Sequence, residues 1–176
     1  MIERLWRPLP NGDRPEIYAL LDGARDPRIY RLANAPRIQS FCLFGRCIDP
    51  ALARAAPWIV YLGRRSPVTT ELLREGWGKS WGVFVASRGI LHDLRRHFRR
   101  LLMVKTEDAR TLLFRFYDPR VLRVYLPTCR AEELRQVFGP VDRFDVEDDT
   151  GATMIEYRFE PRRREGPLVM ERSLRV

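Results

Sequence analysis

The chain has 176 residues, and its 32 Lys and Arg against 23 Asp and Glu give a formal net charge of +9. That length predicts one domain, and 45% hydrophobic with 11% aromatic residues excludes a disordered chain. Apolar runs such as residues 58–62 fall far short of the ~20 residues that span a bilayer, and residues 1–10 lack the apolar core of a secretory signal. The sequence therefore predicts a cytoplasmic protein without membrane insertion.

Apolar runs, capping residues and turn residues predict strands that alternate with helices along the chain. Strands are expected at residues 17–22, 38–44, 58–62, 82–86 and 153–159. Helices are expected at residues 26–34, 50–56, 68–76, 89–102, 121–126 and 132–138, with Asp26, Asp49, Ser87 and Asp118 at helix starts. Residues 104–116 predict a hairpin that turns at 107–110.

These elements predict an α/β fold, a single compact layered domain whose mixed β-sheet is flanked by helices. The domain is expected over residues 1–160. Residues 161–176 are basic and then apolar, and they are expected to form a short C-terminal tail or packing arm.

Residues 90–102 combine an apolar stripe with a basic face. Ile90, Leu94 and Phe98 recur at helical spacing, and the opposite face carries Arg95, Arg96, Arg99 and Arg100. This pattern favours an ordinary solvated helix face. A nucleic-acid-binding module that uses the helix is the alternative interpretation, because the chain is strongly basic.

The search for catalytic and ligand-binding chemistry gives no complete site. The segment Gly76-Trp77-Gly78-Lys79-Ser80 is not a phosphate-binding loop, because Leu73 occupies the position where that loop needs glycine. His92 and His97 are five residues apart, so they do not converge on one ligand. The sequence predicts no catalytic residue, no cofactor and no metal, so no enzyme is expected.

The three cysteines cannot all pair with one another, and they predict reduced thiols. Cys42 and Cys47 stand in an apolar segment with a spacing that is weak for zinc, and Cys129 is distant in sequence. We therefore interpret all three as small apolar side chains.

Asp22 and Asp118 each end an extended segment at a turn. Asp118 and Pro119 form a complete helix start, followed by Arg120. Arg115 is expected on the face opposite its phenylalanine neighbours, where a buried guanidinium requires a carboxylate such as that of Asp22. An internal ion pair with caps is the favoured interpretation, and a partner-docking corner or a small hydrolase site at these carboxylates is the alternative.

Five segments carry a resemblance to the type VI secretion effector-adaptor family, whose domain was first described as one of unknown function. They are Tyr18-Ala19-Leu20-Leu21-Asp22-Gly23-Ala24-Arg25-Asp26-Pro27, Ala56-Pro57-Trp58-Ile59-Val60-Tyr61-Leu62, the basic stretch 94–102, Phe114-Arg115-Phe116-Tyr117-Asp118-Pro119-Arg120-Val121-Leu122, and Phe138-Gly139-Pro140. The resemblance implies a non-enzymatic cytoplasmic adaptor or chaperone. Such proteins bind the N-terminal region of an effector, often beside a PAAR domain or transmembrane segments, and help to load it onto the VgrG spike.

An adaptor needs exposed apolar side chains for its partner. The candidate contact residues are Trp6, Trp77 and Trp81 in loop-like segments, and Leu168 and Met170 in the predicted tail. Ordinary core packing is the alternative for each of them.

Overall fold

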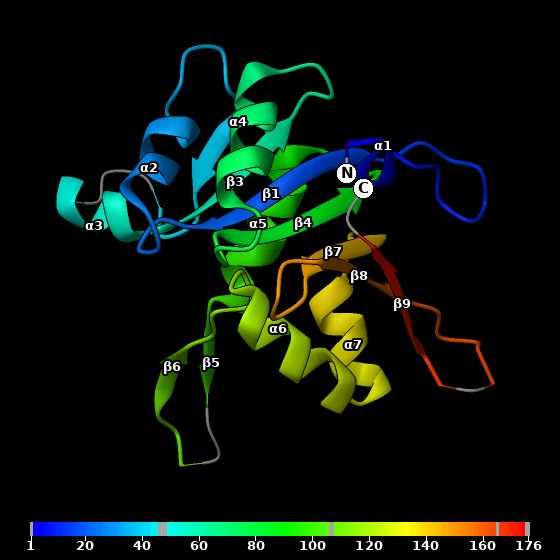
Figure 1. The fold of residues 1–176 in the computed structure, drawn as a ribbon. Helices are drawn as coiled ribbons and strands as arrows, with labels where there is room; N and C mark the ends of the chain where they lie inside the picture. Colours follow the sequence, from blue (N-terminus) through cyan, green and yellow to red (C-terminus); the bar gives the residue numbers. More distant parts are fainter. Residues whose placement is uncertain (1, 46–48, 106–107, 165, 175–176) are drawn as a thin grey trace.

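A computed structural model describes residues 2–45, 49–105, 108–164 and 166–174 (Figure 1). Its centre is a seven-stranded sheet in the order β2–β3–β1–β4–β7–β8–β9, and β5 and β6 form a separate two-stranded sheet. The strands are Glu16–Asp22 (β1), Ser40–Cys42 (β2), Pro57–Leu62 (β3), Gly82–Ser87 (β4), Met103–Lys105 (β5), Thr111–Leu113 (β6), Arg143–Glu147 (β7), Thr153–Phe159 (β8) and Leu168–Leu174 (β9).

Helices cover both faces of the large sheet and give the layered α/β fold that the sequence predicts. They are Ile2–Leu5 (α1), Pro27–Ala33 (α2), Pro50–Ala55 (α3), Pro67–Gly76 (α4), Leu91–Leu101 (α5), Pro119–Tyr125 (α6) and Ala131–Phe138 (α7), with a 3-10 turn at Leu126–Thr128. Buried side chains of α1, α2 and α4 belong to one apolar core, and those of α5, α6 and α7 belong to the other.

Strand β1 shows how one segment serves both cores. Tyr18 and Leu20 enter the core under α5 and α6, whereas Ile17, Ala19 and Leu21 enter the core under α2 and α4. Successive residues of a strand point to opposite faces, so a strand buried on both sides reads as a continuous apolar run. This is why residues 17–22 are recognisable in the sequence.

The pairing direction corrects one part of the predicted fold. Every pairing in the large sheet is antiparallel, where the sequence predicted a mixed sheet. Helix α4 connects β3 to β4, but β1 lies between these two strands and runs opposite to both. The predicted hairpin forms the separate β5–β6 sheet and does not join the large one.

The C-terminal segment also differs from the prediction. Residues 168–174 form β9, which pairs with β8 from Phe159↔Leu168 to Thr153↔Leu174. Much of the predicted tail is therefore an edge strand of the sheet. The prediction also omitted β7, although Phe144 and Val146 alternate there with charged residues and enter the core.

Three of the four predicted helix caps are confirmed. The carboxylates of Asp26, Asp49 and Asp118 each accept a backbone N–H at the start of α2, α3 and α6. Ser87 is not a cap: it ends β4, and its hydroxyl lies 2.6 Å from the carbonyl oxygen of Pro140. Helix α5 begins after Ile90 without a side-chain cap.

Candidate partner-binding site

The predicted corner of Asp22, Arg115 and Asp118 is present. The Arg115 guanidinium pairs with the buried carboxylate of Asp22 at the end of β1, and it lies 3.5 Å from a carboxylate oxygen of Asp118. Arg120 closes the corner, since its Nη2 lies 2.6 Å from Asp118. Pro119 is buried at the first position of α6. The corner therefore ties β1 to the start of α6.

The guanidinium groups keep Asp118 ionised. Burial alone would raise the pKa of Asp118, but hydrogen bonds from the side chain and backbone of Arg120 outweigh it and lower this pKa. Burial alone would lower the pKa of Arg115. The hydrogen bond to Asp22 and the charge of its carboxylate outweigh this effect, so the pKa of Arg115 is raised. A carboxylate with a lowered pKa is poorly suited to donating a proton near neutral pH. The corner has the properties of a structural ion cluster.

Trp77 and Trp81 are core residues, which corrects their selection as partner contacts. Their exposed fractions are 5% and 3%. The indole N–H of Trp77 donates to the carbonyl oxygen of Gly151 at 2.7 Å, and its ring stacks on Phe84. Trp81 lies under the guanidinium of Arg28. Neither side chain has the free surface that a partner would need.

The glycine-rich turn after α4 binds a carboxylate of the same chain. The backbone N–H groups of Gly78 and Ser80 donate to the two carboxylate oxygens of Glu147, at 2.5 and 2.7 Å. Glu147 is buried on β7, and desolvation raises its pKa although these hydrogen bonds oppose the shift. The backbone donors that could hold a phosphate are thus occupied from within, in agreement with the absence of a phosphate-loop sequence.

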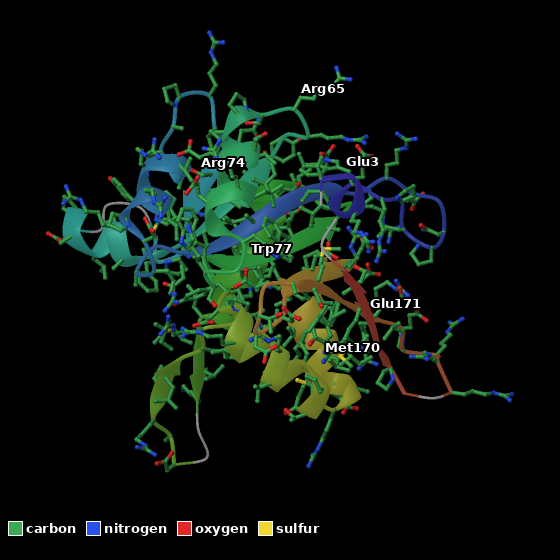
Figure 2. The ribbon with its side chains drawn as sticks, viewed as in Figure 1. Glu3, Arg65, Arg74, Trp77, Met170 and Glu171 are labelled. Carbon is green, nitrogen blue, oxygen red and sulfur yellow. The ribbon has the colours of Figure 1, made fainter. Side chains whose placement is uncertain are left out.

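The other three predicted contact residues lie closer to the surface. Trp6 and Leu168 are half-buried, each packed against one of the two cores. Met170 is 48% exposed on β9, the edge strand of the large sheet, on the side near α7 in Figure 2. Their role as partner contacts stays a prediction.

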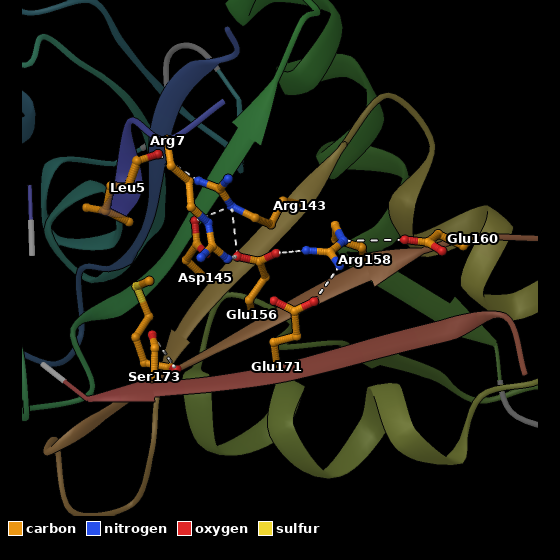
Figure 3. A network of polar contacts seen from close by, with 10 residues as sticks. Leu5, Arg7, Arg143, Asp145, Glu156, Arg158, Glu160, Glu171 and Ser173 are labelled. Carbon is orange, nitrogen blue, oxygen red and sulfur yellow. Dashed lines mark hydrogen bonds and ion pairs between the residues drawn. The ribbon is translucent and has the colours of Figure 1, made fainter. Parts of the chain in front are cut away.

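A buried ionic network, which the sequence analysis missed, lies on one face of β7, β8 and β9 (Figure 3). Arg143 is 1% exposed, and its Nε lies 2.8 Å from the carboxylate of Asp145. Glu156 pairs with both Arg7 and Arg158. Burial raises the pKa of Asp145. The signal available in the sequence was the alternation of charges at 143, 145 and 147 and at 156 and 158.

The network fastens the N-terminal segment to the sheet. The Nη2 of Arg143 donates to the backbone carbonyl oxygen of Leu5 at 2.6 Å. Arg158 continues the chain of ion pairs to Glu171 on β9, with 2.7 Å between nitrogen and oxygen. Ion pairs and hydrogen bonds thus join the N-terminal residues 5–7, the strands β7 and β8, and the edge strand β9.

The basic face of α5 is solvated, as the sequence predicts, and it surrounds a shallow depression. The depression is lined by His92, Arg95, Arg96, Arg99 and Arg100. The guanidinium of Arg95 lies over the ring of Phe41, with 4.7 Å to the ring centroid. His97 is outside this depression, where its Nε2 lies 2.9 Å from the carbonyl oxygen of Val137. The two histidines therefore do not converge.

The β5–β6 hairpin extends away from the helices and the large sheet (Figure 1). Its paired residues Met103 and Leu113 are 55% and 42% exposed, and those of the next pair, Val104 and Leu112, are 39% and 47% exposed. Successive cross-strand pairs face opposite sides of a ribbon, so both faces of the hairpin present aliphatic side chains. The sequence predicts the hairpin but not this exposure.

Within the described ranges, no group of three or more His, Cys, Asp and Glu side chains is placed to hold a metal ion. Cys42 and Cys129 are free thiols, and Cys47 lies outside the described residues. None of the helices in the part of the chain that the structure describes has the length and apolar character of a membrane span.

The fold and these surfaces define a layered α/β domain with an exposed aliphatic arm beside a basic helix. A family model described as Domain of unknown function (DUF4123) matches residues 17–136, more than half of the chain. The protein belongs to this family. The matched range contains the Asp22–Arg115–Asp118 corner, the basic helix and the hairpin. Neither a curated protein nor a solved structure matches the chain.

Proposed function

We propose that this protein is a cytoplasmic adaptor that binds a type VI secretion effector and helps to load it onto the VgrG spike, acting by binding and not by catalysis. Membership of the DUF4123 family and the resemblance of residues 18–140 to secretion adaptors support this proposal. The observation that carries it is the β5–β6 hairpin, because a domain that leaves four large aliphatic side chains exposed on one arm is suited to covering them with a partner.

The hairpin supplies part of the apolar free energy that a complex needs. Complete burial of one large aliphatic side chain stabilises by about 1.5–3 kcal/mol, and each hairpin residue has roughly half of that still to gain. The four side chains together contribute a few kilocalories per mole before the cost of association is subtracted, so a stable complex needs further contacts with the partner. The N-terminal region of the effector, linked to a PAAR domain or to transmembrane segments, is the proposed binding region.

Co-expression tests the proposal. The tagged protein is produced with the effector-like product encoded beside its gene, and separately with the VgrG protein of the same locus. We expect a stoichiometric complex with the effector and a higher soluble yield of that effector. An effector that lacks its N-terminal region is the control, and it should not co-purify. Absence of any complex between soluble, folded partners contradicts the proposal.

A nucleic-acid-binding module is the second candidate, favoured by the depression that five basic side chains line on α5. Duplex DNA binding is measured by fluorescence anisotropy at increasing salt concentration. A phosphate-binding face would lose affinity steeply as salt rises, and replacing Arg99 and Arg100 by alanine would reduce the slope. Weak binding with no difference between the variant and the unchanged protein excludes this candidate.

A further inference from the structure

The hairpin extends the apolar core beyond the edge of the domain. The N–H of Phe114 donates to the carbonyl oxygen of Leu102 at 2.8 Å, which closes the base of the ribbon. Leu102 is 4% exposed within the core under α5, and Phe114 is partly buried against the same core. The two strand pairs that follow, Met103–Leu113 and Val104–Leu112, are exposed. The aliphatic residues of the hairpin therefore continue directly from the core into solvent.

Both outer edges of the ribbon are also available. Strands β5 and β6 pair with each other and with no other described strand. An isolated two-stranded ribbon is marginally stable in water, and it gains stability from a third strand or from an apolar surface against it. Unpaired edge groups are the usual binding element for an extended peptide segment.

The sequence around the hairpin is strongly basic. Residues 95–115 contain seven Arg and Lys against two Asp and Glu. Arg99 and Arg100 lie in the last turn of α5, immediately before β5, and both are exposed. Neither has an ion pair with another described residue, whereas Arg96 in the same helix pairs with Asp93 at 2.6 Å. Two exposed cationic groups thus stand in the turn of α5 that leads into β5.

We infer that the β5–β6 hairpin and the last turn of α5 form one docking site for an apolar segment of a protein partner that is flanked by Asp or Glu residues. The inference rests on the proposed adaptor function and specifies the chemistry of the partner. The aliphatic pairs cover the apolar part of the segment, and Arg99 and Arg100 bind its carboxylates.

Charge argues against a second copy of this chain as the occupant. Two hairpins that pair would bring together the Arg99, Arg100 and Lys105 side chains of both copies, in a protein that already carries a net charge of +9. Like charges placed opposite each other oppose association. A partner segment flanked by Asp or Glu avoids this repulsion, and its carboxylates attract the arginine side chains.

The exposed apolar side chains do not suit a nucleic acid. All the large hydrophobic side chains exposed in the described residues are aliphatic: Leu52, Ile90, Met103, Val104, Leu112, Leu113, Val124 and Met170. Nucleic acid bases that leave their stack need aromatic or guanidinium planes, and they gain little from leucine or methionine.

The order of residues along the hairpin argues against a membrane surface. The aliphatic pairs lie at the base of the ribbon, and the turn carries Asp108, whose carboxylate pairs with Arg110 at 2.6 Å. Insertion with the turn first would bring a carboxylate to the anionic headgroups before any apolar side chain reached the lipid.

Two double variants test the site in the complex with the co-expressed effector. Val104→Thr with Leu112→Thr removes apolar contact and leaves β-branched residues, which favour strands, at both positions; Arg99→Glu with Arg100→Glu reverses the charge. We expect each to weaken the complex by about tenfold or more, as loss of central interface contacts does. The matched controls are Leu52→Thr on α3 and Arg65→Glu, both exposed and outside the site, and these should bind as the unchanged protein does.

Hydrogen exchange of the complex then identifies the partner segment. We expect slowed exchange in residues 103–105 and 111–113 and in one effector segment that is apolar with Asp or Glu at its flank.

A protected effector segment rich in Lys or Arg, or unchanged binding by both folded double variants, overturns this inference and leaves the adaptor function intact. If the unchanged protein captures no effector, the adaptor function fails as well. Loss of the complex on nuclease treatment, or hairpin protection only on vesicles of phosphatidylcholine and phosphatidylglycerol, also overturns the inference.

Discussion

The turn that follows α4 and the β5–β6 hairpin both carry large apolar side chains, but only the apolar side chains of the turn are buried. Trp77 and Trp81 in the turn are nearly inaccessible, whereas the four aliphatic residues of the hairpin are 39–55% exposed. The turn has internal partners for its polar groups: Gly151 accepts from the Trp77 indole, and Glu147 accepts from the backbone. The comparison shows that internal partners, and not side-chain size, distinguish the buried apolar segment from the exposed one.

Replacing Trp77 with alanine should have the largest effect on stability. The change removes a buried ring stacked on Phe84 and leaves the Gly151 carbonyl oxygen without its indole donor. We expect the free energy of unfolding to fall by about 3–5 kcal/mol, as for other large aromatic residues truncated in a core. Urea denaturation followed by circular dichroism measures it. A loss below about 1 kcal/mol would mean that the turn is not part of the core.

The close approach of two glycines should give the next largest effect. A Cβ atom on Gly151 would lie 2.7 Å from the Cα atom of Gly78, and Gly151 has a φ of +71°. We expect Gly151→Ala to cost about 2–3 kcal/mol in urea denaturation, because left-handed strain and backbone overlap act together. Gly12→Ala is the control: its φ of +87° carries strain but nothing lies within 4 Å, so it should cost only about 1 kcal/mol. Equal losses of unfolding free energy in the two variants would show that a local shift of the backbone relieves the overlap with Gly78.

Asp118, which anchors the chain just after the hairpin, should show a smaller effect that depends on pH. We expect Asp118→Ala to cost about 1–2 kcal/mol at neutral pH through loss of the cap and of the Arg120 pair. The folded-state pKa of Asp118 is lowered from 3.8, so its ionic contribution is complete above that value and is lost as pH falls through the folded pKa.

Urea denaturation from neutral pH down to below pH 4 checks the sign of this effect. The difference between the unchanged protein and Asp118→Ala should shrink on acidification. Asp118→Asn is the control, because an asparagine retains the cap and removes only the charge. A difference that grows at low pH would contradict the assigned direction of the pKa.

The smallest expected effect on stability comes from the hairpin. Val104→Thr with Leu112→Thr should change the free energy of unfolding by less than about 1 kcal/mol, because these side chains are already partly in water. The same denaturation experiment measures it. If this variant were as damaging as Trp77→Ala, the hairpin would belong to the core and would not be a free binding element.

The sequence predicted the elements whose signals are local. Continuous apolar runs revealed β1, β3 and β4, and the Asp-Pro pairs at 26–27, 49–50 and 118–119 revealed the starts of α2, α3 and α6. The Arg115–Asp22 pair was also predicted, although the buried partner is the Asp22 carboxylate and the Arg115 side chain is 42% exposed.

The remaining features depend on long-range pairing, which has no local signal. Strand β7 is the exception, because Phe144 and Val146 alternate with charged residues in a local strand pattern that the prediction overlooked. The burial of Trp77 depends on Gly151, which lies 74 positions further along the chain. The exposure of the hairpin depends on which strands the large sheet leaves unpaired. For these reasons the tryptophans were predicted as contacts and the aliphatic arm was not.

The contact between Leu5 and Arg143 has a consequence for synthesis of the protein. These residues are 138 positions apart, and Figure 3 shows them together with Glu156 in one network. At ribosomal rates of 5–20 residues per second, the first segment waits roughly 7–30 s before its binding surface has been translated. The polar contacts of the N-terminal segment with β7 and β8 can therefore form only after most of the chain has been translated, whereas its apolar contacts with β1 and β3 can form earlier.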